Sequence, residues 1–299
     1  MLSVLIPVYN YDIRPLVIAL HHQCQSAQIE FEILCYDDCS ELDFHLTNQE
    51  TLSKIKGVSY IRLDNNVGRS RIRNILAEAA QYDYLLFMDC DSGIVAETYI
   101  SCYVEKLQPN TLLYGGRVYS KMPPKKTEWY FHWYYGSHRE QIPAADRQKL
   151  PYHSFMTNNF LIPRRIFQQI KFDERIRYYG HEDTLFGIEL SQRKIKILHL
   201  DNPLEHLGLE TFEQFLEKSR QAIVNLYRIF CQNKEVSTRL LETFRRLKQW
   251  QLARPVGWVL IQMRPILLRN LKFIPPDLFL FDLYKLSLLL EQDQKEIKK

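Results

Sequence analysis

Short apolar runs alternate with amphipathic segments along the first two thirds of the chain. Short runs bounded by turn residues are typical of buried strands, and apolar residues three or four positions apart are typical of helices. The pattern predicts strands at residues 2–6, 31–36, 58–63, 84–88, 112–116, 158–163 and 195–200, and helices at residues 13–24, 70–80, 97–107, 164–170 and 184–193. Because strands and helices alternate, we expect an α/β fold with a mostly parallel sheet flanked by helices.

Polar residues follow the first four predicted strands. They are PVYN at residues 7–10, DDCS at 37–40, DNNVG at 64–68 and DCDS at 89–92. Parallel strands point the same way, so these ends fall on one edge of the sheet, where doubly wound folds bind ligands. Turn formation alone explains one or two such ends. Three consecutive ends that carry acids favour a ligand site.

The fourth predicted strand brings two carboxylates, Asp89 and Asp91, from the core to this edge. Ionised side chains at the end of a buried strand need compensation. A divalent metal is the commonest partner that accepts carboxylate oxygens in pairs. We therefore predict a cation site at this strand end.

Residues 119–156 interrupt the alternating pattern. They contain WYFHWYY at residues 129–135, and a long connection this aromatic does not fit a disordered linker. Packing, a mobile flap and a sugar-stacking surface all stay open as interpretations. Trp129, Trp133 and Asn159 are the candidate residues for contact with an acceptor or for a loop over the site.

Two further carboxylates, Glu182 and Asp183, stand at the start of a predicted helix. Acids are favoured at helix N-termini for purely structural reasons, because the helix dipole is positive there. Helix capping and catalysis therefore both stay open for this pair.

From residue 211 onward the pattern is helical only. We expect residues 1–208 to form the α/β domain and residues 209–299 to form a helical C-terminal region. The later helical segments are apolar with interspersed bases, and two interpretations compete: packing on the α/β domain, or contact with an anionic membrane surface. The bases are Arg254, Arg264, Arg269, Lys272 and Lys285.

Composition narrows the function classes. The net charge of +4, from 39 basic and 35 acidic residues, is too small to argue for a nucleic-acid partner. Six cysteines without CxxC spacing indicate reduced thiols. We find no export signal and no uninterrupted apolar stretch of about 18 residues, so we expect a cytoplasmic protein without a membrane span. If the C-terminal helices contact lipid, the protein would lie at the inner face of the cell membrane. The sequence leaves the oligomeric state open.

The motifs, taken together and in order, resemble those of family 2 glycosyltransferases with the GT-A fold. The matching stretches are IPVYN at residues 6–10, YDDCS at 36–40, NVG at 66–68 followed by Arg73 and Asn74, DCD at 89–91 and GHED at 180–183. One departure is Cys39, which replaces the usual glycine of the second motif and suggests a different backbone there. A Gln-x-x-Arg-Trp sequence is absent, so the resemblance is to non-processive bacterial members.

The resemblance implies a nucleotide-sugar donor at the sheet edge. Pro7, Tyr9 and Asp38 would hold the base, with the ring able to stack and the carboxylate accepting an imide N–H, which favours uracil and a UDP-sugar. The further donor-binding candidates are Asp37, Asn66, Gly68, Arg73 and Asp89.

The resemblance also implies a metal cofactor. Asp91, with Asp89 and His206 as further candidate ligands, would hold Mn²⁺ or Mg²⁺ against the donor diphosphate. Such a metal gives Lewis-acid assistance to departure of the nucleotide. For His206 a purely structural role stays open.

The implied reaction is an inverting single displacement in which one carboxylate deprotonates the acceptor hydroxyl. We assign Asp183 as the base and Glu182 to donor or acceptor binding, and the reverse assignment stays open. The implied function is transfer of a hexose or N-acetylhexosamine to a saccharide or lipid-linked saccharide in polysaccharide assembly. The alternatives are a nucleotidyltransferase and a non-catalytic nucleotide-sugar-binding protein.

Overall fold

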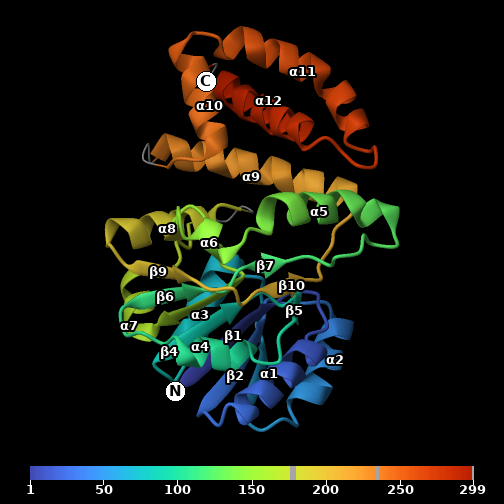
Figure 1. The fold of residues 1–299 in the computed structure, drawn as a ribbon. Coiled ribbons are helices and arrows are strands. Elements are labelled where there is room, and N and C mark those ends of the chain that lie inside the picture. Colours follow the sequence, from blue (N-terminus) through green and yellow to red (C-terminus); the bar gives the residue numbers. More distant parts are fainter. Residues whose placement is uncertain (176–179, 233–235, 298–299) are drawn as a thin grey trace. The chain divides into compact units, whose positions relative to one another are not determined.

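The computed structural model describes residues 1–175, 180–232 and 236–297 (Figure 1). The chain divides into two compact units. The first unit comprises Met1–Ser120, Glu140–Arg177 and Glu182–Gly208, and the second comprises Lys121–Arg139, Tyr178–His181 and Leu209–Lys299.

The first unit is built on a seven-stranded sheet with the order β3-β2-β1-β4-β8-β6-β9. Its strands are β1 (Leu2–Val8), β2 (Phe31–Asp37), β3 (Val58–Arg62), β4 (Tyr84–Met88), β6 (Thr111–Tyr114), β8 (Asn159–Pro163) and β9 (Lys196–His199). Neighbouring strands pair in parallel, except that β8 runs antiparallel to β4 and to β6. The prediction of a mostly parallel sheet in an α/β fold is confirmed.

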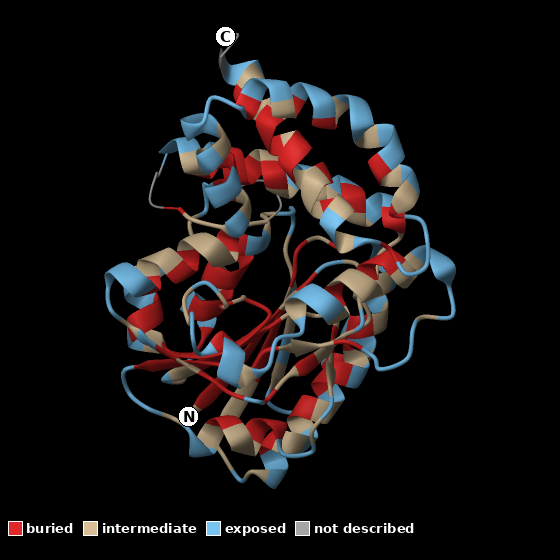
Figure 2. Ribbon diagram, turned by 45° about the horizontal axis from the view of Figure 1, so that its top comes forward, coloured by how far each residue is buried: buried red, intermediate tan, exposed pale blue. Residues whose placement is uncertain are grey.

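The central strands β1, β4, β8 and β6 are buried on both faces of this sheet, and Figure 2 shows the strands largely in the colour of buried residues. The edge strand β3 has only half-buried and exposed residues. Along β1, Val4 and Ile6 pack into one hydrophobic cluster, whereas Leu5 packs into the other. In β4, Leu86 belongs to the first cluster and Phe87 to the second. Burial on both faces explains why these strands are almost continuously apolar in the sequence.

The helices of the first unit are α1 (Arg14–Ser26), α2 (Leu42–Leu52), α3 (Arg69–Ala79), α4 (Tyr99–Glu105), α6 (Ala144–Arg147), α7 (Arg164–Ile170) and α8 (Glu182–Gln192). Every strand and helix expected in residues 2–200 is present, with ends within two residues of those expected. The sequence pattern missed α2. This helix buries Leu52 but exposes Leu42 and Leu46, so its apolar residues do not mark a single inward face.

A second, three-stranded sheet was also missed, because its strands are only two or three residues long. It has the order β5-β10-β7, with β5 (Ser92–Ile94), β10 (Leu204–His206) and β7 (Arg117–Val118). β5 follows directly after Asp91, and β10 pairs with it so that His206 lies opposite Ser92. The small sheet thereby brings His206 close to the end of β4.

The second unit is helical. It contains η1 (Thr127–Trp129), α5 (Tyr130–Tyr135), α9 (Phe212–Gln232), α10 (Arg239–Gln249), α11 (Ala253–Asn270) and α12 (Leu278–Ile297), and the π-helical turn η2 (Gly136–Glu140) follows α5. Its core joins Phe131 of the aromatic segment to Phe212, Leu267 and Phe281 of the C-terminal helices. Packing is therefore one role of the aromatic segment. Among the described residues, no helix has the length and apolar character that crossing a membrane requires.

Candidate active site at the carboxyl edge of the sheet

The carboxyl ends of β1 to β4 meet at one edge of the large sheet. Val8 at the end of β1 pairs with Asp37 at the end of β2, and Asp37 pairs in turn with Arg62 at the end of β3. β8 runs the other way and begins at this edge, where Asn159 lies opposite Met88. The polar residues that follow these strands are therefore neighbours in space.

Asp38 holds the loop after β3. Its two carboxylate oxygens accept hydrogen bonds from the backbone N–H groups of Val67 (2.6 Å) and Gly68 (3.0 Å), and its carbonyl oxygen accepts one from the side chain of Asn66 (3.0 Å). Burial raises the pKa of the Asp38 carboxyl, although the two N–H groups favour its charged form. Each carboxylate oxygen keeps a second lone pair, so a further N–H donor can still be accepted.

Tyr9, the candidate for stacking on the donor base, is exposed to solvent. The ring of Tyr9 is 54% exposed, whereas Pro7 is half-buried. The backbone of Asn10, directly after Tyr9, has a φ of 47° and donates its N–H to Ser40 Oγ at 2.8 Å. This bond ties the turn after β1 to the turn after β2 and leaves the tyrosine ring free to contact a planar ligand.

Asp37 requires a correction. We expected it among the donor-binding residues, but it is fully buried, and its carboxylate accepts hydrogen bonds from the Tyr60 hydroxyl and from the Ser40 N–H at 2.7 Å. It shapes the turn that carries Asp38. In the same turn Cys39 has a φ of 65°, the left-handed conformation that favours glycine, so the cysteine occupies a strained position.

Asp89 lies between two arginines. Arg73 Nη2 donates to Oδ1 at 2.7 Å, and Arg117 Nη2 donates to Oδ2 at 3.3 Å. Arg117 also bonds Glu140 at 3.1 Å, and the Tyr119 hydroxyl donates to the same Glu140 oxygen at 2.5 Å. Because both oxygens of Asp89 are paired with guanidinium groups, this carboxylate is less suited to direct metal ligation than Asp91.

Asp91 faces His206, with Oδ2 3.6 Å from His206 Nδ1. Burial acts to raise the pKa of the Asp91 carboxyl, but His206 together with the charges of Arg117 and Arg69 outweighs burial and lowers it. Asp91 Oδ1 is buried and has no hydrogen-bond partner among the described residues. Because Gly208 has no side chain, there is room beside the Asp91 carboxylate. A Cβ atom at position 208 would collide with Asp91 Oδ2.

These observations fit a divalent cation. Asp91 Oδ1 is a buried carboxylate oxygen without a partner, and Oδ2 of the same carboxylate lies near a histidine nitrogen. Together they offer a mixed O/N donor set that suits Mn²⁺. In the described part of the chain, no three His, Cys, Asp or Glu side chains converge as a ligand set. The protein would therefore supply Asp91 and His206, and the remaining ligands would come from a bound diphosphate and water.

Glu182 and Asp183 form the first turn of α8. Glu182 is buried and lies 3.3 Å from Arg69 Nε; burial acts to raise its pKa, but the charges of Arg69 and Arg73 lower it overall. Burial and the adjacent charge of Glu182 raise the pKa of Asp183 to about 6, and its Oδ1 accepts the Thr184 N–H at 2.7 Å. A carboxylate with a raised pKa next to one with a lowered pKa is typical of acid–base sites.

Asn159 is a second correction. Its side chain is fully buried and accepts hydrogen bonds from the hydroxyls of Tyr99 and Tyr103, both at 2.7 Å. Its amide nitrogen donates to the carbonyls of Gly116 (2.9 Å) and Asn202 (3.0 Å). All of its hydrogen-bonding capacity is used inside the protein, so it holds the strands together and does not contact an acceptor.

Trp129 and Trp133 belong to the second unit. Lys126 Nζ lies 4.4 Å from the centre of the Trp129 ring, and the rings of Trp133 and Tyr130 are 5.4 Å apart. Both indoles are half-buried. Their contact with an acceptor stays a prediction.

The sequence pattern missed three charged residues of this site, which are Arg69, Arg117 and Glu140. Arg69 lies one turn before Arg73 in α3, so helical spacing from a known site residue was a signal for it. Arg117 and Glu140 are 23 positions apart in sequence and meet through β7, a strand too short to predict.

The sequence model described as "Glycosyl transferase family 2" matches residues 3–171, more than half of the chain. The chain therefore belongs to glycosyl transferase family 2, as its motifs indicated. The matched range includes Asp38, Asp89 and Asp91 and ends before Asp183 and His206.

Two curated relatives show how far the similarity extends. An uncharacterized glycosyltransferase of Bacillus subtilis (strain 168), YfnE, is 25% identical over 264 residues, which covers 67% of this chain and 65% of the relative. The hyaluronan synthase of Pasteurella multocida is 22% identical over 230 residues, which covers 63% of this chain and 22% of the synthase. The chain thus spans less than two thirds of the length of these relatives.

Solved structures with the same fold include a mannosyltransferase and S. aureus TarS. The mannosyltransferase PcManGT of Pyrobaculum calidifontis, in complex with GDP-Man and Mn²⁺, aligns with a TM-score of 0.56 at 11% identity over 78% of this chain and 64% of the other. S. aureus TarS 1–349, in complex with UDP-GlcNAc, aligns with a TM-score of 0.51 at 18% identity over 99% and 91%. The first unit has the GT-A fold that the motifs predicted.

Proposed function

We propose that this protein is an inverting glycosyltransferase that moves a hexose or N-acetylhexosamine from a UDP-sugar to an acceptor hydroxyl. The observation that carries the proposal is the Asp91–His206 pair with its unpartnered buried oxygen, placed at the carboxyl edge of a family 2 sheet. We further propose that residues 1–208 form the catalytic domain, apart from Lys121–Arg139, which belong to the second unit, and that residues 209–299 form a helical C-terminal region.

The donor base is assigned to the turn after β1 and to Asp38. Tyr9 offers an exposed ring for stacking, and Asp38 offers a fixed carboxylate that can accept an imide N–H. The imide is a feature of uracil, which favours UDP. The solved structures of similar fold hold UDP-GlcNAc in one case and GDP-Man in the other, which supports a nucleotide sugar as the class of donor.

Asp91 and His206 are the residues that would hold Mn²⁺ or Mg²⁺. When bound, the metal supplies a Lewis acid that stabilises the negative charge developing on the departing diphosphate. Asp89 keeps Arg73 and Arg117 in place at the same edge. These guanidinium groups are positioned to attract the anionic donor.

Asp183 is the proposed base. It takes the proton of the acceptor hydroxyl while the acceptor oxygen attacks the anomeric carbon and the bond from that carbon to the nucleoside diphosphate breaks. A pKa of about 6 leaves most of the carboxylate ionised at neutral pH, yet makes it a stronger base than an ordinary aspartate. Glu182 stays ionised beside Arg69 and is assigned to binding donor or acceptor.

The proposed acceptor is a saccharide or a lipid-linked saccharide, and the proposed setting is polysaccharide assembly on the cytoplasmic side of the cell membrane. Two relatives of this chain are named hyaluronan synthase and chondroitin synthase, which supports the class of product. Trp129 and Trp133 are candidates for stacking on the acceptor sugar.

One experiment tests the proposal. The full chain with Mn²⁺ is incubated with a panel of UDP-, GDP- and dTDP-sugars together with a panel of saccharide acceptors, because transfer needs a hydroxyl that receives the sugar, and release of the nucleoside diphosphate is measured. We expect turnover with a UDP-sugar. Pyrophosphate release from a nucleoside triphosphate would instead indicate a nucleotidyltransferase, and binding of UDP-sugars without turnover would indicate a non-catalytic binding protein. Either result would overturn the proposal.

A further inference from the structure

Helix α11 is apolar on both of its faces. The residues of its buried face follow helical spacing and are Ala253, Gly257, Leu260 and Leu267. The large apolar residues that it exposes are Trp258, Val259, Met263 and Ile266. Positions 258, 259, 263 and 266 are separated by one, four and three residues, so these side chains share the side of the helix opposite the buried face.

This outer face is exposed to an unusual degree. Trp258 is 66% exposed and Ile266 is 59% exposed, and Phe273 and Ile274, just beyond the helix, are 58% exposed each. Single exposed apolar residues are normal on protein surfaces. A row of exposed apolar residues along one helix indicates a surface that binds a partner.

The charged side chains of α11 are all positive. The helix contains Arg254, Arg264 and Arg269 and has no acidic residue. Arg264 is paired with Glu291 at 2.6 Å, on the packed side. Within the described residues, neither Arg254 nor Arg269 forms an ion pair. Arg254 and Arg269 therefore stand near the two ends of the exposed apolar row and favour a partner that is negatively charged.

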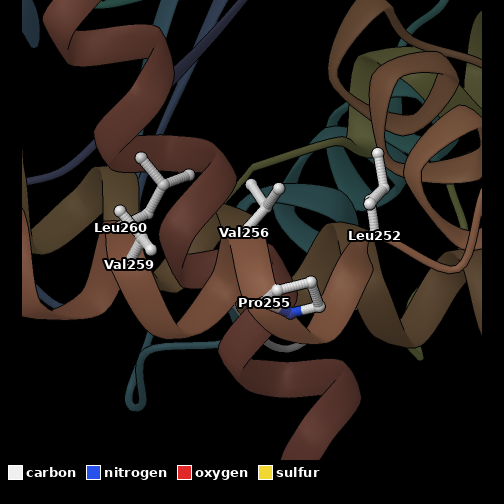
Figure 3. A pocket seen from close by; sticks show the side chains of 5 residues that line it. All are labelled: Leu252, Pro255, Val256, Val259 and Leu260. Carbon is white, nitrogen blue, oxygen red and sulfur yellow. The ribbon is translucent and has the colours of Figure 1, made fainter.

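The beginning of α11 also lines a small apolar pocket of about 270 Å³ (Figure 3). The side chains around it are those of Leu252, Pro255, Val256, Val259 and Leu260. A pocket lined entirely by hydrocarbon side chains suits hydrocarbon rather than a polar ligand.

We propose that the outer face of α11 docks on an anionic lipid bilayer. An exposed apolar face with a tryptophan, bordered by unpaired arginines and free of acids, is the pattern of a helix that lies in the membrane interface. The apolar side chains would enter the boundary between headgroups and acyl chains, and the arginines would contact anionic headgroups. This surface lies wholly in the second unit and does not depend on which reaction the sheet edge catalyses.

The experiment measures co-sedimentation of the full chain with vesicles. We expect binding to vesicles of equal parts phosphatidylglycerol and phosphatidylcholine, and little binding to pure phosphatidylcholine. Binding to the anionic vesicles should fall steeply as the salt is raised to about 1 M, where the Debye length is only about 3 Å. With acyl chains brominated near the headgroup, fluorescence quenching should be strong in the wild type and much weaker in Trp258→Phe.

Variants then test the surface itself. Trp258→Ser combined with Ile266→Ser should lower the partition constant by about tenfold or more, and Arg254→Gln or Arg269→Gln should lower it by about fivefold each. The matched control is Leu46→Ser combined with Leu150→Ser, which removes two similarly exposed apolar residues from the first unit and should change nothing. Circular dichroism and nucleotide release from the donor, measured without vesicles, confirm that each variant is folded.

Two results would overturn the proposal. One is vesicle binding that is absent in the wild type or unchanged in the Trp258/Ile266 double variant. The other is a concentration-dependent dimer in analytical ultracentrifugation that this variant converts to monomer, because the face would then be an interface between two copies of the chain.

Discussion

Glu182 and Asp183 are adjacent in the first turn of α8, and their surroundings shift their pKa values in opposite directions. Arg69 and Arg73 overcome burial and lower the pKa of Glu182, whereas burial and the charge of Glu182 itself raise the pKa of Asp183 to about 6. One carboxylate is thereby kept ionised and the other is made more basic. The following two predictions use this difference to identify the base.

The first prediction concerns pH. As the proposed base, Asp183 must be deprotonated to take the acceptor proton, so kcat/KM should rise tenfold per pH unit below about 6 and level off above it. Asp183→Asn should lose about 10²-fold to 10⁴-fold in transfer while still binding UDP, as measured by calorimetry. A variant that keeps the wild-type rate would exclude Asp183 as the base.

The second prediction concerns Glu182→Gln. This change removes the negative charge that raises the pKa of Asp183, so the acidic limb of the pH–rate profile should move to lower pH. Activity should fall only in part, because Asp183, the proposed base, is still present. If Glu182→Gln instead abolished transfer and Asp183→Asn retained it, the two roles would have to be exchanged.

The third prediction concerns the cation. Asp91→Asn and His206→Ala should each weaken Mn²⁺ binding in the presence of UDP by about tenfold or more, because each removes one of the two proposed protein ligands. The readout is calorimetric titration with Mn²⁺ and the Mn²⁺-dependent rise in Tm, both independent of turnover. His22→Ala, a change at an exposed histidine of α1, is the control and should leave Mn²⁺ affinity unchanged.

The fold was largely predictable because its central strands are buried on both faces and stand out as apolar runs. β4 was expected at residues 84–88 and α7 at residues 164–170, and both elements have these bounds in the structure. The elements that were missed lack such a signal. β10 is three residues long, and α2 exposes Leu42 and Leu46.

The site was predictable in outline but not in its division of roles. The motif placed Asp37 and Asp38 side by side and gave both the same role. The structure shows that the Asp37 carboxylate accepts hydrogen bonds from Tyr60 and Ser40, whereas Asp38 fixes the loop after β3. The bonds from Tyr60 to Asp37 and from Val67 to Asp38 join residues 23 and 29 positions apart, so no local pattern reports them. For the same reason Arg117 was missed, although it pairs with Asp89.

The fourth prediction concerns Arg117→Ala. Arg117 is largely buried between Asp89 and Glu140, so its removal leaves two carboxylates without their shared cation. Breaking a buried pair in this way should cost about 3–5 kcal/mol of unfolding free energy. The control is Glu78→Ala, which breaks the exposed pair with Lys171 and should cost about 1 kcal/mol or less. Urea unfolding measures both, and equal losses would show that Arg117 does not hold the site together.

The last prediction tests the structural role of Asn159. Asn159→Leu keeps a similar volume but removes the acceptor of the Tyr99 and Tyr103 hydroxyls and the donor to two backbone carbonyls. Each buried polar group left without a partner costs about 1–3 kcal/mol, so several kcal/mol of stability should be lost. Urea unfolding measures the loss, with Asn65→Ala, at an exposed asparagine, as the control that should change stability by about 0.5 kcal/mol or less. In the variant that remains folded at low temperature, KM for the acceptor should stay near the wild-type value, because the Asn159 side chain lies inside the protein. A stable Asn159→Leu variant with a raised acceptor KM would restore the role in acceptor binding that the sequence first indicated.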